Sequence, residues 1–289
     1  QNHARELMEL HTIGVDNFTQ QDVEEVSRCL TGWSIDINVF GPNLGRFVYY
    51  DIIHDKGAKT VLGKAIPAGG GQSDGETLLN ILSRDADIAP MTARFIAMKI
   101  ARQFWGYNPP IDLLNAMAAA YLATDGDIKA MVRICLSKEW LVQAPPKYKR
   151  PFHYLVSALR TAKAEVSDDA VLFALFYVLQ WMGHVPFQWP APNGYADSYG
   201  YWAGLILPRW RIAAILLLQP VIGLDVQSLL DAANAEDFLD KLSARFFQGT
   251  LPDTDRAALF AFLQTAPNNE LRRRETMGLG VSAPGFQWY

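Results

Sequence analysis

The stretch Pro90–Val142, PMTARFIAMKIARQFWGYNPPIDLLNAMAAAYLATDGDIKAMVRICLSKEWLV, decides the fold class of this chain. Apolar residues recur at intervals of three and four within it, and short breaks rich in Gly, Pro or Asp separate three such segments. This spacing predicts amphipathic helices. The helical segments cover residues 75–84, 90–106, 110–123, 127–142, 149–164, 167–182, 203–218, 225–232, 235–247, 253–265 and 268–278. We therefore expect a mainly α protein, a multi-helix globular array, and the lack of a clean repeat period argues against a solenoid.

The composition is that of a globular protein that does not bind nucleic acid. Half of the 289 residues are apolar, 19% are charged, and the formal net charge is −4. A nucleic-acid interface needs a basic stripe, whereas the longest basic run is Arg272–Arg274, which we interpret as a solvated helix face. Cys29 and Cys135 lack the spacing of a zinc site, so they predict no metal centre.

The two longest apolar stretches do not predict a membrane span. Val171–Met182 is shorter than the roughly 20 residues that a spanning helix needs. The other stretch, Leu205–Gly223, is interrupted by Pro208, Arg209 and Arg211. We interpret both stretches as buried core helices.

One segment, Arg46–Gly63, departs from the helical pattern and predicts a small inserted β-hairpin. Aromatic and β-branched residues stand at Phe47–Tyr50 and Thr60–Leu62, on either side of His54–Gly57. Asp55 and Gly57 suit a turn between them, because Asp bonds to its own backbone and Gly accepts a positive φ.

Capping patterns and composition outline the domain organisation. Thr19–Asp22 and Ser73–Glu76 predict the capped starts of two helices. We expect a single α-helical domain over 1–289, with a possible subdivision into 1–145, which holds the hairpin, and 146–289.

The opening segment Gln1–Gly14, QNHARELMELHTIG, carries the densest polar chemistry of the chain. It reads as one helix, and at about 100° per residue its polar side chains share one face, namely Asn2, Arg5, Glu6 and Glu9. His3 and His11 fall on the apolar side, so imidazoles and carboxylates cannot converge on one ion. We predict no metal site on this helix, and the sequence identifies no cofactor.

The polar face of this helix has three interpretations. It is a solvated surface with an Arg5–Glu9 pair, or a network in which Arg5 ties helices together and Asn2 satisfies a backbone group. Alternatively it is a catalytic face, in which Glu6 or Glu9 acts as general acid or base while Arg5 orients them or grips an anionic substrate.

Two further segments contain candidate binding residues. His54 is either a turn residue or an acid, base or ligand beside the opening helix. The stretch 183–202 is long, rich in Pro and aromatic residues, and includes Trp189, Tyr195 and Trp202. It is either a stiff lid packed over Arg209 or a set of aromatic faces for sugar rings or a partner.

The order of several motifs resembles the bacterial family known as domain of unknown function 1800. The matching residues are Asn2, Arg5, Glu6, Glu9, Thr12 and Gly14 of the opening helix, Thr31–Trp33, His54–Gly57 with Lys59, Thr92–Ile96 with Lys99, Lys149–Pro151 with Arg160, Met182–Gly183, Pro192–Tyr195, Trp202, Leu207–Arg209 and Pro284–Gln287. The resemblance covers nearly the whole chain. The resemblance implies little about activity. His54, Asp55, Lys59 and Arg209, which lie in these motifs, are our further candidate binding residues.

The resemblance also carries expectations about context. Members of this family are often longer at the N-terminus, which implies that this chain is roughly the C-terminal two thirds of one. They often look exported, and their genes often lie beside those of sulfatase-like proteins. These features imply a periplasmic or extracellular setting and a sulfatase-like partner or a surface polysaccharide.

Two functional hypotheses follow from the sequence. The first is an exported helical interaction protein that uses the hairpin and the aromatic loop as contact surfaces for such a partner or polymer. The alternative is a hydrolase or lyase acting on a polysaccharide, with Glu6 and Glu9 as acid and base and Arg5 orienting them. The residues do not decide whether the protein is an enzyme.

Overall fold

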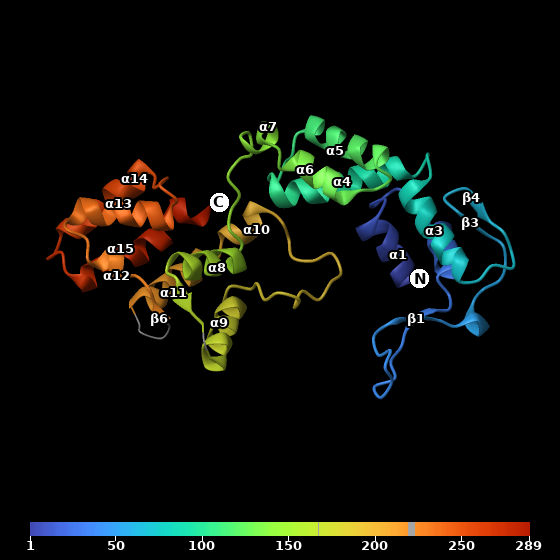
Figure 1. Ribbon diagram of the computed structural model, residues 1–289, viewed down its shortest axis with the longest axis horizontal. Helices are drawn as coiled ribbons and strands as arrows, with labels where there is room; N and C mark the ends of the chain where they lie inside the picture. Colours follow the sequence, from blue (N-terminus) through green and yellow to red (C-terminus); the bar gives the residue numbers. More distant parts are fainter. Residues whose placement is uncertain (167, 219–222) are drawn as a thin grey trace. The chain divides into compact units, whose positions relative to one another are not determined.

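The computed structural model describes residues 1–166, 168–218 and 223–289, apart from the side chain of residue 218 (Figure 1). The chain divides into two compact units, unit 1 (Gln1–Pro145) and unit 2 (Pro146–Tyr289). Within the described ranges, fifteen α-helices carry the structure, and the strands form only two-stranded antiparallel sheets. The prediction of a mainly α fold is therefore confirmed.

Unit 1 combines helices with two small hairpins. The helices are α1 (Asn2–Glu6), α2 (Gln20–Cys29), α3 (Gln72–Arg84), α4 (Ala89–Phe104), α5 (Ile111–Ala123), α6 (Ile128–Cys135) and α7 (Lys138–Leu141), and a π-helical turn, η1 (Leu7–His11), continues α1. The strands are β1 (Trp33–Ile35), β2 (Phe47–Tyr49), β3 (Lys59–Val61) and β4 (Lys64–Ile66), and a 3-10 turn, η2 (Asp51–Ile53), follows β2. One apolar core joins α1, η1, α2 and α3 to the β3–β4 hairpin, and a second lies among α4, α5 and α6.

The helix starts follow local capping chemistry in one case and tertiary structure in another. At α2 the Thr19 side chain accepts from the Asp22 backbone while the Asp22 side chain accepts from the Thr19 backbone, so this predicted cap is confirmed. The Ser73–Glu76 capping box is wrong, because α3 begins at Gln72 with Gly71 as its N-cap. Asp74, in the first turn of α3, instead points into the protein.

The predicted hairpin exists in a different pairing. The residues around Phe47–Tyr49 pair with Trp33–Ile35, and Lys59–Val61 pairs with Lys64–Ile66. The second hairpin turns at Leu62 and Gly63, whose φ angles of 49° and 78° match the two-residue turns that suit twisted strands. The predicted turn His54–Gly57 therefore connects two hairpins rather than closing one.

Unit 2 is a helical assembly with one short sheet. Its helices are α8 (Pro151–Thr161), α9 (Asp169–Trp181), α10 (Tyr199–Ala203), α11 (Ile206–Leu218), α12 (Gln227–Leu230), α13 (Ala235–Phe246), α14 (Asp253–Gln264) and α15 (Glu270–Ser282), and η3 (Pro284–Gln287) is a 3-10 turn. Strands β5 (Ala164–Glu165) and β6 (Gly223–Leu224) pair in antiparallel fashion. The core gathers buried residues from α8, α11, α13, α14 and α15, and α11 packs closely on α15.

The two apolar stretches of unit 2 differ in burial. On α9 only Leu179 is buried, and Phe173, Tyr177 and Trp181 form an exposed aromatic stripe, so the prediction of a buried core helix is wrong there. The second stretch forms α11, whose Ile212, Ala213 and Leu217 are buried in the core, so the prediction is confirmed for its described residues. Residues 219–222 of this stretch lie outside the described chain. No helix in the described residues is both long and apolar enough to cross a bilayer.

Candidate functional site

The polar face of the opening helix is only partly engaged with the rest of unit 1. Asn2 Nδ2 donates to Glu6 Oε1 at 2.7 Å, one turn away. Arg5 Nη2 donates to Gln20 Oε1 at 2.5 Å, and the guanidinium lies over the Phe18 ring, so Arg5 ties the helix to the start of α2. In the described chain no Arg5–Glu9 ion pair forms.

The helix changes its winding in the middle of the motif. From Leu7 to His11 the backbone is π-helical, so the angle of 100° per residue does not apply beyond Glu6. The Thr12 hydroxyl donates to Leu7 O at 2.8 Å, and Lys99 Nζ donates to Leu10 O at 2.7 Å, which holds this turn in place. Glu6 and Glu9 are half-buried, and among the described residues neither enters an ion pair. Single π turns are frequent at functional sites, and a catalytic role for these two carboxylates stays a prediction.

His54, Lys59 and Asp74 form a buried ionic network. Asp74 Oδ2 accepts from Lys59 Nζ at 2.7 Å and lies 3.1 Å from His54 Nε2, and the His54 and Lys59 side chains are fully shielded from solvent. Lys59 Nζ also donates to the carbonyl oxygens of Asp55, at 2.5 Å, and Gly57, at 2.9 Å. Burial alone would raise the pKa of Asp74, but the hydrogen bonds from Lys59 and His54 outweigh it and hold that pKa below its usual range.

This network joins two points that are distant in sequence. His54 Nδ1 lies 2.8 Å from the carbonyl oxygen of Thr31, and the Thr31 hydroxyl accepts from the Asp55 backbone at 2.8 Å. Both ring nitrogens of His54 therefore lie within hydrogen-bonding distance of an oxygen atom, and the tautomer of the ring decides which nitrogen donates. Residue 31 and residues 54–55 are therefore held together at the start of α3.

A second, partly exposed layer surrounds the network. The Arg28 guanidinium bonds to both carboxylate oxygens of Glu25 and to Asp55 at 2.9 Å. The hydrogen bond from Arg28, with one from the Gly57 backbone, lowers the pKa of Asp55 to about 2. Glu25 also accepts from the Thr60 backbone at 2.9 Å, so this layer ties α2 to β3.

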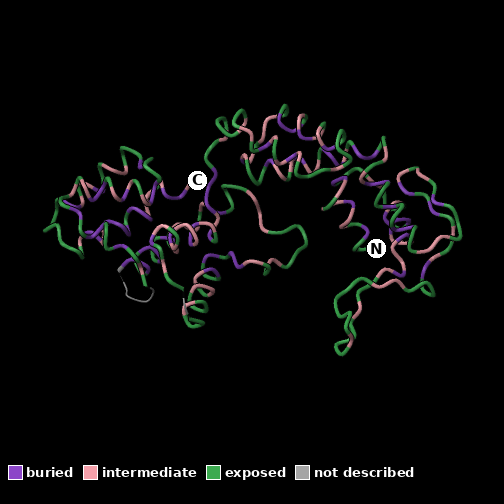
Figure 2. The backbone as a smooth tube through the Cα atoms, in the orientation of Figure 1, coloured by how far each residue is buried: buried purple, intermediate pink, exposed green. Residues whose placement is uncertain are grey.

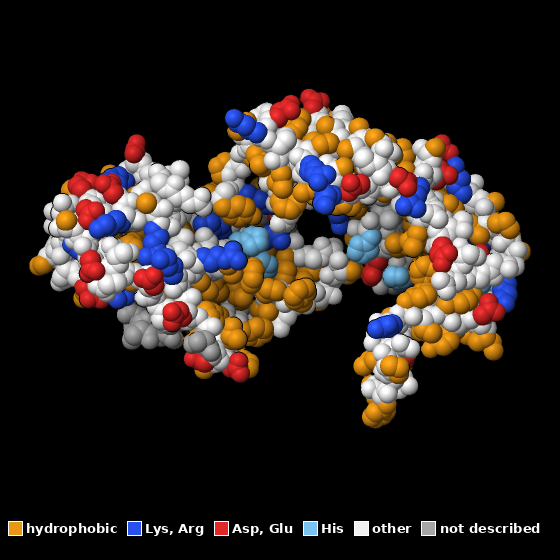
Figure 3. All heavy atoms as spheres, in the orientation of Figure 1, with side chains coloured by type: hydrophobic (Ala, Val, Ile, Leu, Met, Phe, Trp, Pro, Cys, Tyr) orange, Lys and Arg blue, Asp and Glu red, His pale blue; other side chains and the backbone are white. Residues whose placement is uncertain are grey.

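Between Thr31 and His54 the chain forms an apolar arm, residues 33–53. The arm consists of β1, β2, their connection and η2. It projects from unit 1, and its backbone is mostly exposed (Figures 1 and 2). Figure 3 shows hydrophobic side chains on this segment. Nine large apolar residues of the arm are exposed, and Phe40, at 96%, and Ile52, at 94%, are almost fully so. The nine are Ile35, Ile37, Val39, Phe40, Leu44, Phe47, Tyr50, Ile52 and Ile53.

The base of the arm is packed against α3. The Trp33 ring lies so close to Gly75 that an added Cβ would stand 2.3 Å from it, and Phe47 meets the Trp33 ring edge-on at 5.2 Å. At the C-terminal end of the arm, Lys56 Nζ donates to Asp51 at 2.6 Å. The arm is thus anchored at its base and exposed along its length.

The aromatic loop of unit 2 packs largely on itself. The Trp202 ring is fully buried, its Nε1 donates to Ala196 O at 2.8 Å, and the buried His184 ring lies 4.9 Å away. The Tyr195 hydroxyl donates to Val185 O at 2.9 Å. Trp189 is half-buried, with its Nε1 donating to Asn193 at 3.0 Å. These contacts favour the packed-lid interpretation, and a binding role for the three rings stays a prediction.

Arg209 lies beneath this part of unit 2 and is completely buried. Its guanidinium donates to Gln287 Oε1 at 3.0 Å and to Lys149 O at 2.7 Å, and it stacks over the Tyr148 ring at 4.5 Å. Arg209 therefore joins α11 to the segment before α8 and to the C-terminal turn. Its geometry is that of a residue that organises the core.

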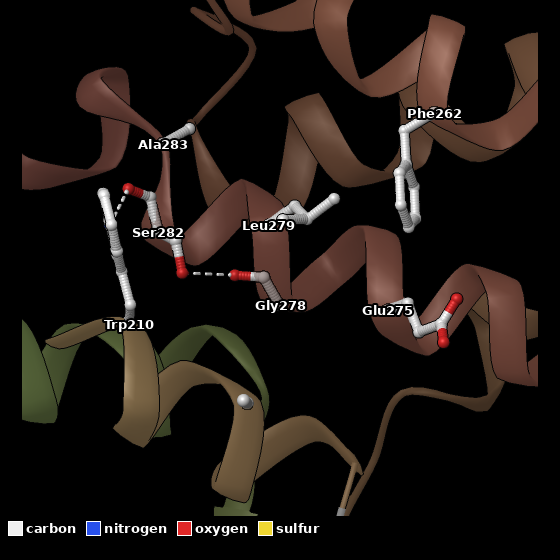
Figure 4. Close-up of a pocket in the computed structure, with 8 residues that line it drawn as sticks. Trp210, Phe262, Glu275, Gly278, Leu279, Ser282 and Ala283 are labelled. Carbon is white, nitrogen blue, oxygen red and sulfur yellow. Dashed lines mark hydrogen bonds between the residues drawn. The ribbon is translucent and has the colours of Figure 1, made fainter. Parts of the chain in front are cut away.

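A cavity of about 540 Å³ opens between α11, α14 and α15 of unit 2, outside every predicted site. Figure 4 shows Trp210 and Phe262 on either side of the α15 segment that carries Leu279. Its polar groups already have partners, since Trp210 Nε1 donates to Ser282 O at 3.2 Å, the Ser282 hydroxyl donates to Gly278 O at 2.8 Å, and the Glu275 carboxylate pairs with Arg272 at 3.0 Å. The cavity is consequently apolar in character.

The residues that sequence reasoning missed are Asp74, Arg28 and the apolar arm. Asp74 gave no signal, because only the folded chain brings α3 to Lys59. The arm did give one, an unusual density of Ile, Val and Phe between Ile35 and Phe47 in a segment without helical periodicity. Within the described chain, no group of three or more His, Cys, Asp or Glu side chains is arranged to hold a metal ion.

Comparison with known proteins identifies a family but no activity. The family model described as "Protein of unknown function (DUF1800)" matches residues 1–288. This match gives no support to the expectation that the chain is only the C-terminal two thirds of such a protein. Neither the curated proteins nor the solved structures yield a match to the chain.

Proposed function

The chain belongs to the DUF1800 family of proteins of unknown function, and we propose that it is an interaction protein that docks its apolar arm into an apolar surface of a partner protein. The observation that carries this proposal is the run of nine exposed large apolar residues on one anchored projection. Single exposed apolar residues are ordinary, whereas a contiguous set of this size marks an interaction surface.

The energetics of the arm favour binding. Complete burial of one large apolar side chain contributes about 1.5–3 kcal/mol, so Phe40 and Ile52 alone supply a substantial part of a specific interface. The network of His54, Lys59 and Asp74 holds the two ends of the arm before a partner arrives. Less ordering entropy is then lost on association.

The nature of the partner is a further part of this proposal. We infer an exported protein whose arm contacts a sulfatase-like protein, and the support for this is the family resemblance. A surface polymer is the other candidate, and it would use Trp189 and Tyr195, which offer aromatic faces. The arm favours a protein, because polysaccharides present little continuous apolar surface.

The test compares the arm with a matched exposed residue elsewhere. Association of the full chain with a sulfatase-like protein, the partner that the family resemblance implies, is measured by sedimentation velocity. Phe40→Ser weakens association by about tenfold or more. A tenfold change in the dissociation constant corresponds to about 1.4 kcal/mol, which is no more than the burial of one large apolar side chain contributes. Phe173→Ser, which removes an exposed ring from α9 of unit 2, leaves it unchanged. Equal association of the two variants with this partner, or no association of the wild type with it, rejects the proposal. Binding of a surface polysaccharide alone favours the other candidate instead.

Acid–base catalysis by Glu6 and Glu9 is the second candidate, and one observation favours it. Neither carboxylate is neutralised by an ion pair within the described residues, and Glu9 lies in a π-helical turn. If the protein is a polysaccharide hydrolase or lyase, Glu9→Gln abolishes release of reducing ends while the thermal midpoint stays that of the wild type. Asp16→Asn, an exposed carboxylate beyond the turn, serves as the control. Wild-type protein that releases nothing from a panel of acidic and neutral polysaccharides excludes this function.

A further inference from the structure

A second cavity in unit 2, of about 360 Å³, lies beneath the C-terminal segment. It is bounded by α8, by the connection between α13 and α14, and by the last residues of the chain. The residues used below are Lys149, Ser157, Gln248, Phe286 and Tyr289, all of which line it. None of its lining residues is acidic.

Lys149 brings a positive charge to this cavity. Its backbone is fixed, because its N–H donates to Gln287 O at 2.7 Å and its carbonyl accepts from Arg209 at 2.7 Å. The residue is only 7% exposed, and its ammonium stands 3.8 Å over the centre of the Phe286 ring. Among the described residues the ammonium has no hydrogen-bond acceptor and no carboxylate partner.

The other two buried lysines show how unusual this is. Lys59 bonds to Asp74 at 2.7 Å, and Lys147 bonds to Asp197 at 3.0 Å. Buried charges in proteins are normally paired in this way, because an unpaired one costs several kcal/mol of solvation. Lys149 has no such partner among the residues that the structure describes. Burial, reinforced by the nearby charge of Arg209, lowers its pKa to about 8.

Three polar side chains around Lys149 can donate hydrogen bonds into the cavity. The Ser157 hydroxyl and the Gln248 amide make no hydrogen bond within the described part of the chain, and the Tyr289 hydroxyl has only a 3.4 Å contact to His153 Nδ1. A hydroxyl and an amide N–H can donate to the same anion that neutralises an ammonium.

We propose that this cavity is a binding site for a small anion, a carboxylate or tetrahedral oxyanion group held against Lys149 Nζ. The bound anion supplies the counter-charge that the chain lacks, and Ser157 and Gln248 donate to its remaining oxygens. The volume lies at the small end of the range for ligand sites, so the ligand is a small molecule or the charged end of a larger one.

The experiment is calorimetric titration of the full chain with sodium acetate, sodium sulfate and sodium phosphate against a sodium chloride background of equal ionic strength. The wild type binds at least one of the three, and the one that binds distinguishes a carboxylate from a tetrahedral oxyanion. Lys149→Met weakens binding by tenfold or more, while Lys241→Met, an exposed lysine of α13, does not.

Thermal unfolding keeps the test independent of folding defects. In chloride alone Lys149→Met unfolds at the wild-type temperature or above it, because the variant removes a buried, uncompensated charge. The binding anion raises the midpoint of the wild type only. Ser157→Leu retains Lys149 but fills the cavity, and it also loses binding. Wild-type protein that binds none of the three anions, or a Lys149→Met variant that binds as tightly as the wild type, overturns the proposal.

Discussion

Substitution of Lys59 by Met tests whether the network of His54, Lys59 and Asp74 is a buried ionic network. Met preserves most of the side-chain volume, so the main change is loss of the ammonium. Asp74 then keeps only His54, and the carbonyl oxygens of Asp55 and Gly57 lose their donor. Removing one member of a buried ion pair typically lowers the free energy of unfolding by about 3–5 kcal/mol.

An exposed pair a few residues away provides the control. Lys56 bonds to Asp51 at 2.6 Å, but their side chains are 54% and 60% exposed, so Lys56→Met costs about 1 kcal/mol or less. The double variant Lys59→Met/Asp74→Leu loses less stability than Lys59→Met alone, because no uncompensated carboxylate remains buried.

The assay is urea-induced unfolding, with hydrogen exchange of β3, β4 and α3 used to assign the transition to unit 1. A loss for Lys59→Met no larger than that for Lys56→Met would refute the reasoning. The dependence of the free energy of unfolding on pH in the acid range tests the same network a second time. Because the pKa of Asp74 is lowered in the fold, its contribution is present above the unfolded value of 3.8 and disappears as the pH falls through the lowered pKa.

Two further predictions concern glycine positions and pH. Gly75→Ala lowers the thermal midpoint because its Cβ would stand 2.3 Å from the Trp33 ring, whereas Gly278→Ala, whose Cβ meets only Ala213 O at 3.7 Å, leaves the free energy of unfolding equal or raises it by about 0.5–1 kcal/mol. The measurement is differential scanning calorimetry, and equal shifts of the thermal midpoint in the two variants would contradict this prediction. Burial lowers the pKa of His184 to about 4, so the stability of unit 2 is complete above pH 6.5 and falls between pH 6.5 and 4 as the unfolded chain takes up the proton. The measurement is the thermal midpoint of unit 2 across this pH range. The assignment is disproved if the midpoint does not change with pH in the wild type, or if it falls equally in His184→Gln.

Much of the helical framework could be predicted because its signals are local. The three- and four-residue spacing in 90–106 and 110–123 survives as α4 and α5, and the Thr19–Asp22 cap forms as written. These features depend on residues within one or two turns of each other. Neighbouring side chains in the sequence therefore suffice to determine them.

The errors concern features that depend on distant partners. Phe47–Tyr49 pairs with Trp33–Ile35 across a long connection, and the turn at Leu62 and Gly63 is hidden because Leu seldom adopts a positive φ. Asp74 looked like an ordinary residue of a helix start, and only the position of Lys59 in the fold makes it the centre of a network.

The candidate catalytic face shows the same limit at shorter range. A wheel drawn at a constant 100° places Glu9 beside Arg5, but η1 changes the winding after Glu6. No residue type in Leu7–His11 predicts a π-helical turn. The Thr12 and Lys99 bonds that hold it come from outside the turn, and Lys99 belongs to a different helix.

The closure between Thr31 and Asp55 makes the arm a replaceable module. The bonds between Thr31, His54 and Asp55 involve none of residues 33–53, whereas the base of the arm also holds to unit 1 through Tyr50 N–H, which donates to Gly32 O at 2.8 Å, and through Trp33 against Gly75. Because the entropy of closing a loop grows only slowly with its length, a shorter, longer or foreign segment can replace the connection between β1 and β2 at little cost to unit 1. Partner specificity can then diverge among proteins built on this scaffold while the helices beneath stay unchanged.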